Sequence, residues 1–144
     1  MKRKIFMAAV VLYLSAPGLL AGESQPLAKV NTSANNVIEA FVNANKFGDA
    51  GLLNAVLNPG AVIRLNRGAQ VITQSKNDLV AFYKRSGGVE MNCKADYKIL
   101  SASDDTVTAR IDFSFPEFVQ QHFVTIEKDR KGRWKITQIS KFSA

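Results

Sequence analysis

Four long stretches of alternating apolar and polar residues occupy the second half of this chain, and they constrain its fold more than any other feature. They are residues 92–101, 106–115, 118–128 and 133–142. Alternation with a period of two predicts β-strands that each have one buried and one exposed face. The links between the stretches are short and contain Asp, Gly and Pro, which are typical of turns. Long neighbouring strands with such short links predict an antiparallel meander.

Three short helices are predicted ahead of this meander. Apolar residues recur at helical spacing in residues 37–44 and again in 52–57, and a capping-box pattern of Ser75 and Asp78 begins a third helix. Thr32 or Ser33 is placed to cap the first helix, because a side-chain oxygen there accepts a free backbone N–H. Two short strands, residues 61–65 and 69–73, are predicted between the second and third helices.

The N-terminus has the composition of a secretory signal peptide. Three basic residues at 2–4 precede an apolar run at 5–14, and small residues follow at Ala21 and Gly22. The apolar run is short for a membrane span, so an uncleaved anchor is the weaker alternative. We expect cleavage after Ala21 or Gly22 and a periplasmic or secreted protein without stable membrane insertion. The predicted organisation is a signal peptide at 1–22, an extended leader at 23–31 and one domain at 32–144.

Composition argues against several functions. The chain has a net charge of +7, but three of its 19 basic and none of its 12 acidic residues lie in 1–22, which leaves 16 basic against 12 acidic residues, or +4. This mild excess predicts no nucleic-acid partner. One histidine, His122, and one cysteine, Cys93, cannot supply a metal-ligand set, so we expect no metal and no cofactor. Cys93 is interpreted as a small buried strand residue, with pairing between chains or a reactive thiol as alternatives.

The order of elements resembles a known superfamily. The resemblance is carried by residues 37–57 (VIEAFVNANKFGDAGLLNAVL), 75–85 (SKNDLVAFYKR) and 134–140 (WKITQIS). These segments are similar to those of the NTF2-like superfamily, which includes the SnoaL-like cyclases and the ketosteroid isomerases. The resemblance implies an α+β conical roll in which three N-terminal helices pack on a curved antiparallel sheet around a deep, often apolar pocket. It also implies that a homodimer could form through the outer sheet face.

The alternation separates the residues that face the helices from those that face outward. The predicted inner residues are Cys93, Ala95, Tyr97 and Ile99; Val107, Ala109, Ile111, Phe113 and Phe115; Phe118, Gln120, His122, Val124 and Ile126; and Trp134, Ile136, Gln138 and Ser140. This face is apolar and aromatic, and its few polar groups are suited to orienting a ligand. Asp96, Arg110 and Asp112 are predicted to point outward.

The first hypothesis for function is an exported, non-enzymatic module whose apolar pocket binds a small hydrophobic ligand or a partner protein. The residues expected to bind the ligand are Phe82, Tyr97, Phe113, Gln120, His122, Trp134 and Gln138. A basic run at 128–135 is interpreted as solvated turn charge, with an anionic partner as the alternative. A third possibility is a structural dimeric scaffold with a vestigial pocket.

The second hypothesis is a SnoaL-like isomerase, cyclase or hydratase. The isomerases that the chain resembles use a pocket Asp as base, and the sequence does not match this position unless a β-bulge turns Asp96 or Asp112 inward. In this alternative His122 acts as acid and base while Tyr97 orients a carbonyl oxygen. It requires the two side chains to converge within about 5 Å inside a solvent-reachable cavity.

Overall fold

The computed structural model describes residues 27–143. The segment interpreted as a signal peptide lies outside these residues, as does the start of the predicted leader. The described elements are η1 (Leu27–Lys29), α2 (Ala34–Phe47), α3 (Ala50–Val56), β1 (Leu57–Arg67), β2 (Gln70–Ser75), α4 (Lys76–Ser86), β3 (Lys94–Ala102), β4 (Thr106–Ser114), β5 (Val119–Lys128) and β6 (Trp134–Ser143). The four predicted long strands are confirmed to within two residues at each end. η1 is a turn of 3₁₀-helix where the sequence suggested extended chain.

The helices begin and end at the residues whose side chains or backbone favour those ends. Ser33 Oγ accepts a hydrogen bond from Asn36 N at 3.0 Å, so Ser33 is the N-cap of α2. Gly48 ends α2 with a φ of +63°, a left-handed conformation that glycine adopts without strain. The capping box predicted at the start of α4 is present, with both reciprocal hydrogen bonds between Ser75 and Asp78.

The strands form one six-stranded sheet in the order β2-β1-β6-β5-β4-β3. Neighbouring strands are antiparallel except β1 and β6, which are parallel. The prediction of a wholly antiparallel sheet is therefore wrong, and the sheet is mixed. After β1 the chain forms β2, α4 and β3 to β5, and it returns beside β1 only with β6. Such a long connection is what a parallel pair needs, because a short turn can join only antiparallel strands.

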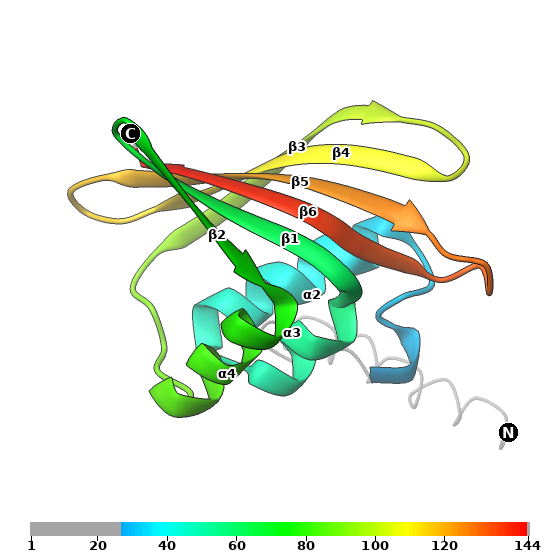
Figure 1. The fold of residues 1–144 in the computed structure, drawn as a ribbon, viewed down its shortest axis with the longest axis horizontal. Helices are drawn as coiled ribbons and strands as arrows, with labels where there is room; N and C mark the ends of the chain where they lie inside the picture. The colour runs from blue at the N-terminus through cyan, green and yellow to red at the C-terminus, as the bar shows by residue number, and fades with distance from the viewer. Residues whose placement is uncertain (1–26, 144) are drawn as a thin grey trace, which may run out of the picture.

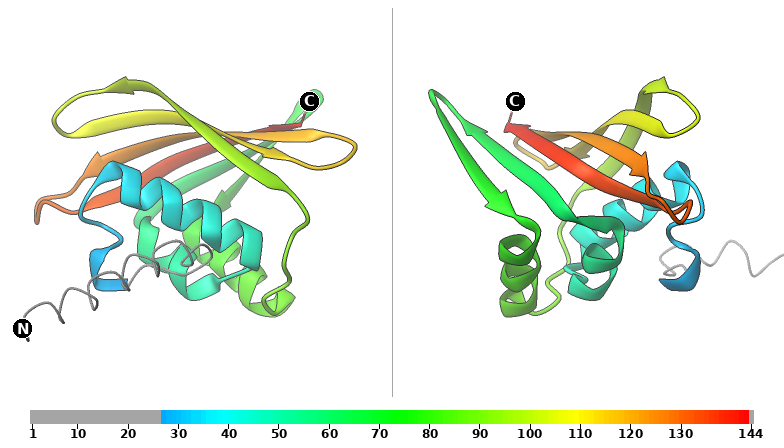
Figure 2. Two further views of the ribbon diagram at one scale, coloured as in Figure 1. Left: turned by 180° about the vertical axis from the view of Figure 1, so that it is seen from behind. Right: turned by 45° about the vertical axis from the view of Figure 1, so that its right-hand side comes forward.

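The helices cover one face of the curved sheet (Figures 1 and 2). α2 and α3 precede the sheet, but α4 lies between β2 and β3 in sequence, so the expectation of three N-terminal helices is only partly met. The core forms where Ile38, Phe41 and Leu53 of the helices meet Ile111 and Ile136 of the sheet, all of them at most 1% exposed. In residues 27–143 no helix has the length and apolar character needed to cross a membrane.

A β-bulge in β6 changes which of its residues face the helices. Thr125 pairs with Gln138 but Ile126 pairs with Ile136, so Thr137 is an extra residue without a partner in the register. Beyond it the alternation is reversed: Ile139 is fully buried, whereas Gln138 is exposed. The prediction that Gln138 and Ser140 point inward is therefore wrong, and Lys141 takes an inner position instead.

Candidate functional site

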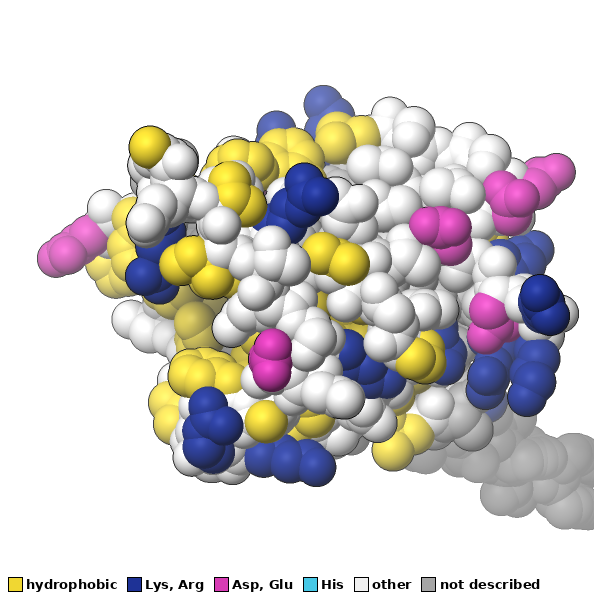
Figure 3. Space-filling model, in the orientation of Figure 1, with side chains coloured by type: hydrophobic (Ala, Val, Ile, Leu, Met, Phe, Trp, Pro, Cys, Tyr) yellow, Lys and Arg dark blue, Asp and Glu magenta, His cyan; other side chains and the backbone are white. Residues whose placement is uncertain are grey.

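A cavity of about 530 Å³ lies between α4, the β1–β2 hairpin, residues 86–91 and the ends of β5 and β6. This volume is within the range of small-molecule sites. Its apolar wall consists of Leu65, Leu79, Phe82, Tyr83, Val89 and Met91, and its polar residues are Asn45, Arg67, Gln74, Ser86, Gln120 and Lys141. Hydrophobic side chains gather on this side of the molecule, over α4 and between α4 and the hairpin (Figure 3). The cavity therefore combines an apolar surface with a few polar groups.

One wall depends on a close approach between the end of α2 and the segment after α4. Met91 N donates a hydrogen bond to Lys46 O at 2.7 Å. A Cβ added to Gly48 would lie 2.9 Å from Val89 N, closer than real Cβ atoms come to backbone. Gly48 thus ends the helix and also leaves room for the segment that carries Val89 and Met91.

A hydrogen-bonded pair joins α4 to α2 beside the cavity. Tyr83 Oη donates to Asn45 Oδ1 at 2.6 Å, and Asn45 Nδ2 donates to Phe41 O at 2.8 Å. Burial raises the pKa of Tyr83 to about 12. The hydroxyl is therefore neutral over the physiological range, and it holds the two helices together.

His122 lies in the core behind the cavity. It is 1% exposed and packs against Phe113 and Phe41, with ring centroids 4.9 and 5.7 Å away. Its Nε2 lies 2.9 Å from Gln120 Oε1, whereas its buried Nδ1 has no hydrogen-bond partner among the described residues. Burial, and then the nearby Lys141, hold the pKa of His122 well below 6.5. The imidazole is therefore neutral at pH 7, and its hydrogen-bond partner Gln120 lines the cavity whereas His122 does not.

Lys141 is a cavity-lining residue that the sequence reasoning missed. It lies opposite His122 in the β5–β6 register and lines the cavity. Within residues 27–143 its ammonium takes part in no ion pair and no hydrogen bond. Burial lowers the pKa of Lys141 from 10.5 to about 8. Lys141 faces the helices only because of the bulge at Thr137. A strict alternation along β6 would place Lys141 on the outer face, so the sequence pattern gives no sign of its true position.

The structure brings together some of the predicted ligand-binding residues and separates others. Phe82 and Gln120 line the cavity, and Phe113 and His122 form the core behind it. Gln138 is on the outer face because of the bulge. The remaining two, Tyr97 and Trp134, lie elsewhere.

Tyr97 lines a separate, smaller cavity of about 270 Å³, together with Glu39, Val42, Asn43 and Ala95. It is 36% exposed. Tyr97 pairs with Ile111, which in turn pairs with His122, so the two residues lie two strands apart, roughly 10 Å between backbones. Neither cavity has both of them in its lining. The convergence of His122 and Tyr97 that the enzymatic alternative requires is not observed.

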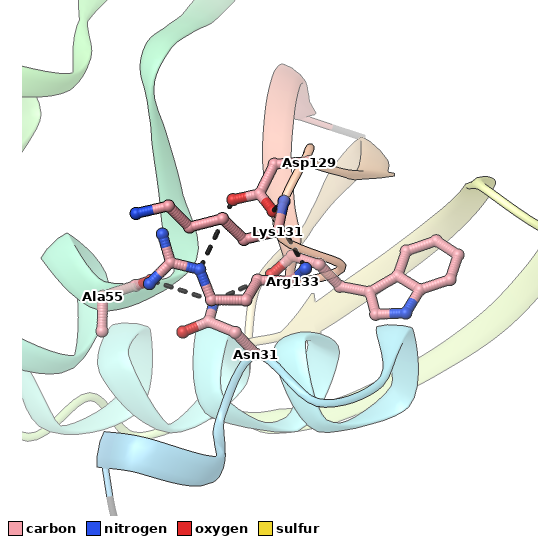
Figure 4. Close-up of polar contacts among 6 residues, drawn as sticks. Asn31, Ala55, Asp129, Lys131 and Arg133 are labelled. Carbon is pink, nitrogen blue, oxygen red and sulfur yellow. Dashed lines mark hydrogen bonds and ion pairs between the residues drawn. The ribbon is translucent and has the colours of Figure 1, made fainter.

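Trp134 lies at the far end of the sheet from the cavity. Lys128 Nζ lies over the Trp134 ring, 5.3 Å from its centroid, in a cation–π contact. The backbone N–H of Trp134 donates to Asn31 O, and Trp134 O accepts from Asn31 Nδ2. Asn31 Nδ2 also donates to Ala55 O at 3.1 Å, which ties the start of the domain to α3 and β6 (Figure 4). The hydrogen bonds at this end of the sheet therefore connect three segments that are far apart in the sequence.

The basic hairpin tip beside Trp134 is organised by Asp129. Its carboxylate accepts hydrogen bonds from the backbone N–H groups of Lys131 and Arg133 and lies 3.5 Å from the Arg133 Nε (Figure 4). The bond from Arg133 N is the main reason that the pKa of Asp129 is lowered. The carboxylate of Asp129 therefore offsets part of the positive charge of the basic run 128–135.

The outer face of the sheet carries both charged and aromatic groups. Arg110 Nε lies 3.3 Å from Asp112 Oδ1, and Phe123 packs edge-on against Phe142 with centroids 5.6 Å apart. The outward direction predicted for Arg110 and Asp112 agrees with the burial of their neighbours Ala109, Ile111 and Phe113. The homodimer through this face stays a prediction.

Comparison with known proteins identifies the fold. No protein-family model and no curated protein matches the sequence. Among solved structures, an NTF-2 like protein of unknown function from Silicibacter pomeroyi matches with a TM-score of 0.65 at 15% identity, covering 76% of this chain and 92% of that one. An NTF2-like protein of unknown function from Shewanella baltica matches with a TM-score of 0.65 at 16% identity, covering 76% and 90%.

A ketosteroid isomerase-like protein from Erwinia carotovora atroseptica is similar with a TM-score of 0.58 at 14% identity, covering 80% of this chain and 96% of that one. At these identities the likeness establishes architecture and not function. The chain has an NTF2-like fold, which confirms the resemblance found in its sequence.

Proposed function

We propose that this protein is an exported, non-enzymatic module that binds a small apolar ligand in the cavity between α4 and the sheet. The observation that carries the proposal is the cavity itself. It has a volume of about 530 Å³, and its apolar wall comes from β1, α4 and the segment that follows α4. Concave, largely apolar spaces with a few polar groups are the common form of small-molecule sites.

The states of Tyr83 and His122 argue against the enzymatic alternative. The hydroxyl of Tyr83 is engaged by Asn45, and burial raises its pKa to about 12. His122 is enclosed by aromatic rings, and burial holds its pKa well below 6.5. General acid–base catalysis favours a group that reaches the substrate and has a pKa near the working pH. Neither Tyr83 nor His122 meets both conditions, so the isomerase, cyclase or hydratase alternative, which depends on His122, loses its acid and base. Lys141 lines the cavity with a pKa of about 8, and we assign it a role in binding because no Asp, Glu or His is among the described lining residues beside it.

A thermal-shift screen of small apolar compounds tests the proposal. A ligand specific for the folded state, present at about 100 times its Kd, stabilises the protein by about 2.7 kcal/mol. For a domain of this size that corresponds to a rise in Tm of roughly 10 °C. We expect several apolar compounds to raise the Tm in proportion to the logarithm of their concentration.

A cavity-filling variant localises the effect. Ser86 is exposed at the rim and lines the cavity, so Ser86→Trp places an indole across the opening. Lys84→Trp adds the same ring to an exposed position of α4 outside the lining. We expect Ser86→Trp to abolish the ligand-induced rise in Tm and Lys84→Trp to retain it. A screen in which no compound stabilises the wild type would instead favour the scaffold interpretation.

Export is the second part of the proposal, and it rests on the basic and apolar pattern of residues 1–22. Expression of the full chain followed by N-terminal sequencing of the purified protein tests it. We expect the mature chain to begin at Gly22 or Glu23. Recovery of intact protein from the membrane fraction would contradict export as a cleaved product.

A further inference from the structure

We propose that the cavity selects small molecules that carry one carboxylate on an apolar body, and that Lys141 binds the carboxylate. This inference rests on the proposed binding function and specifies its ligand class. The two can fail separately, because binding of neutral apolar compounds alone would support the function and not the ligand class.

The first observation is the sign of the charge that lines the cavity. Lys141 and Arg67 are basic, and no Asp or Glu is among the described lining residues. Arg67 is exposed at the rim, whereas Lys141 lies deeper, on the inner face of β6. A cavity with low-dielectric walls and charge of one sign attracts ligands of the opposite sign.

The second observation is that the ammonium of Lys141 lacks a partner. In residues 27–143 it takes part in no ion pair and no hydrogen bond. A partly buried charge without a counter-ion is unfavourable, and a bound anion removes that cost. Burial lowers the pKa of Lys141 to about 8, because it disfavours the charged form. An anion at this place would raise the pKa again by favouring the charged form.

The neighbours of Lys141 do not compete with such an anion for the ammonium. His122, opposite on β5, is neutral at pH 7 and bonded to Gln120. Tyr83 on α4 donates its hydroxyl to Asn45 and keeps its proton. Arg67 on β1 is cationic. The titratable groups around the cavity thus leave Lys141 as a donor without an acceptor.

The walls define the rest of the ligand. Leu65, Leu79, Phe82 and Met91 line the same space, so a ligand that reaches Lys141 is in contact with apolar surface. Burying its body there contributes about 25 cal/mol per Å² of apolar area. Of the two cations, Arg67 is exposed at the rim and only the ammonium of Lys141 lies among the apolar walls. A single negative charge at this depth suits a carboxylic acid better than a doubly charged phosphate.

Titration calorimetry at pH 7 tests the inference, with the processed protein purified from cells that express the full chain. The probes are octanoate, the neutral octan-1-ol of the same length, and inorganic phosphate. We expect wild-type protein to bind octanoate about ten- to a hundredfold more tightly than octan-1-ol, the range given by a hydrogen bond to a charged group. Phosphate should bind at least tenfold more weakly than octanoate.

Two variants complete the test. Lys141→Met keeps an unbranched apolar side chain without charge and should bind both eight-carbon probes equally. Lys135→Met removes the same charge from the same strand outside the cavity and should keep the preference for octanoate. An unchanged preference in Lys141→Met, or phosphate binding as tight as octanoate binding, would overturn the inference. If neither eight-carbon probe binds wild-type protein, the ligand class is overturned, and the thermal-shift screen decides the proposed function separately.

Discussion

Replacing Lys141 by Met should make the protein more stable at neutral pH. Burial lowers the pKa of Lys141 from 10.5 to about 8. Each pKa unit corresponds to about 1.4 kcal/mol, so the fall of about 2.5 units means that the charged ammonium costs the folded state between about 3 and 4 kcal/mol at most. Met has a similar length and no charge, and it packs readily against apolar side chains. We therefore expect the free energy of unfolding of Lys141→Met to exceed that of the wild type by about 2–3 kcal/mol at pH 7.

The pH dependence separates this cause from improved packing. Below pH 8 both the folded and the unfolded chain hold the proton on Lys141, so the whole penalty applies. Between pH 8 and 10.5 the folded chain has lost the proton while the unfolded chain keeps it, so wild-type stability rises relative to that of the variant. The difference should thus be largest near pH 7 and nearly absent at pH 10.5.

Urea denaturation followed by the fluorescence of the single tryptophan, Trp134, measures this difference. The control is Lys94→Met, which removes a lysine from an exposed position of β3 and should change stability little at any pH. A Lys141→Met variant that is no more stable than wild type at pH 7 would show that the buried ammonium does not destabilise the folded state. So would a difference that does not change between pH 7 and 10.5.

Three further predictions concern residues that support the cavity and the domain. Gly48→Ala should destabilise the protein by more than the roughly 1 kcal/mol that a left-handed Ala costs, because its Cβ meets the backbone of Val89. Gly68→Ala is the control in the same urea assay: Gly68 also has a positive φ but has open space around it, so this variant should lose only the roughly 1 kcal/mol of the left-handed conformation. His122→Leu should make the free energy of unfolding fall less steeply as the pH drops below 6.5. In the wild type the unfolded histidine binds a proton there and the folded one does not, so stability falls by up to about 1.4 kcal/mol per pH unit. The same slope in the variant and the wild type would contradict the burial of a neutral His122. Asn31→Ala should cost about 1–3 kcal/mol by leaving two partly buried carbonyls without a donor, whereas the exposed Asn92→Ala should be nearly neutral; equal effects would show that the Asn31 bonds do not stabilise the domain.

Local chemistry made much of the fold predictable. The N-cap oxygen of Ser33, the glycine at 48 and the reciprocal pair of Ser75 and Asp78 each determine a helix end through contacts within four residues. In β4 the alternation holds along the whole strand, and its buried residues are those predicted. Such features depend on short-range sterics and hydrogen bonds, which sequence displays directly.

The site was less predictable, because it depends on pairings between distant segments. The bulge at Thr137 exists only in the register between β5 and β6, and it exchanges Gln138 for Lys141 on the inner face. The parallel pairing of β1 with β6 joins segments more than 70 residues apart. Tyr97 shows the same limit in another way. It pairs with the buried Ile111, as the predicted face requires, yet it is 36% exposed and lines a different cavity together with residues of α2.

The most direct test of the account is to map octanoate binding on the processed, ¹⁵N-labelled protein by NMR titration. We expect the backbone amide shifts to change along the cavity, at Leu79, Tyr83, Met91 and Lys141, and the amide shifts near Tyr97 to stay unchanged. Changes centred on Tyr97 and Val42, or no change at Lys141 when octanoate is saturating, would contradict the claim that this cavity is the binding site.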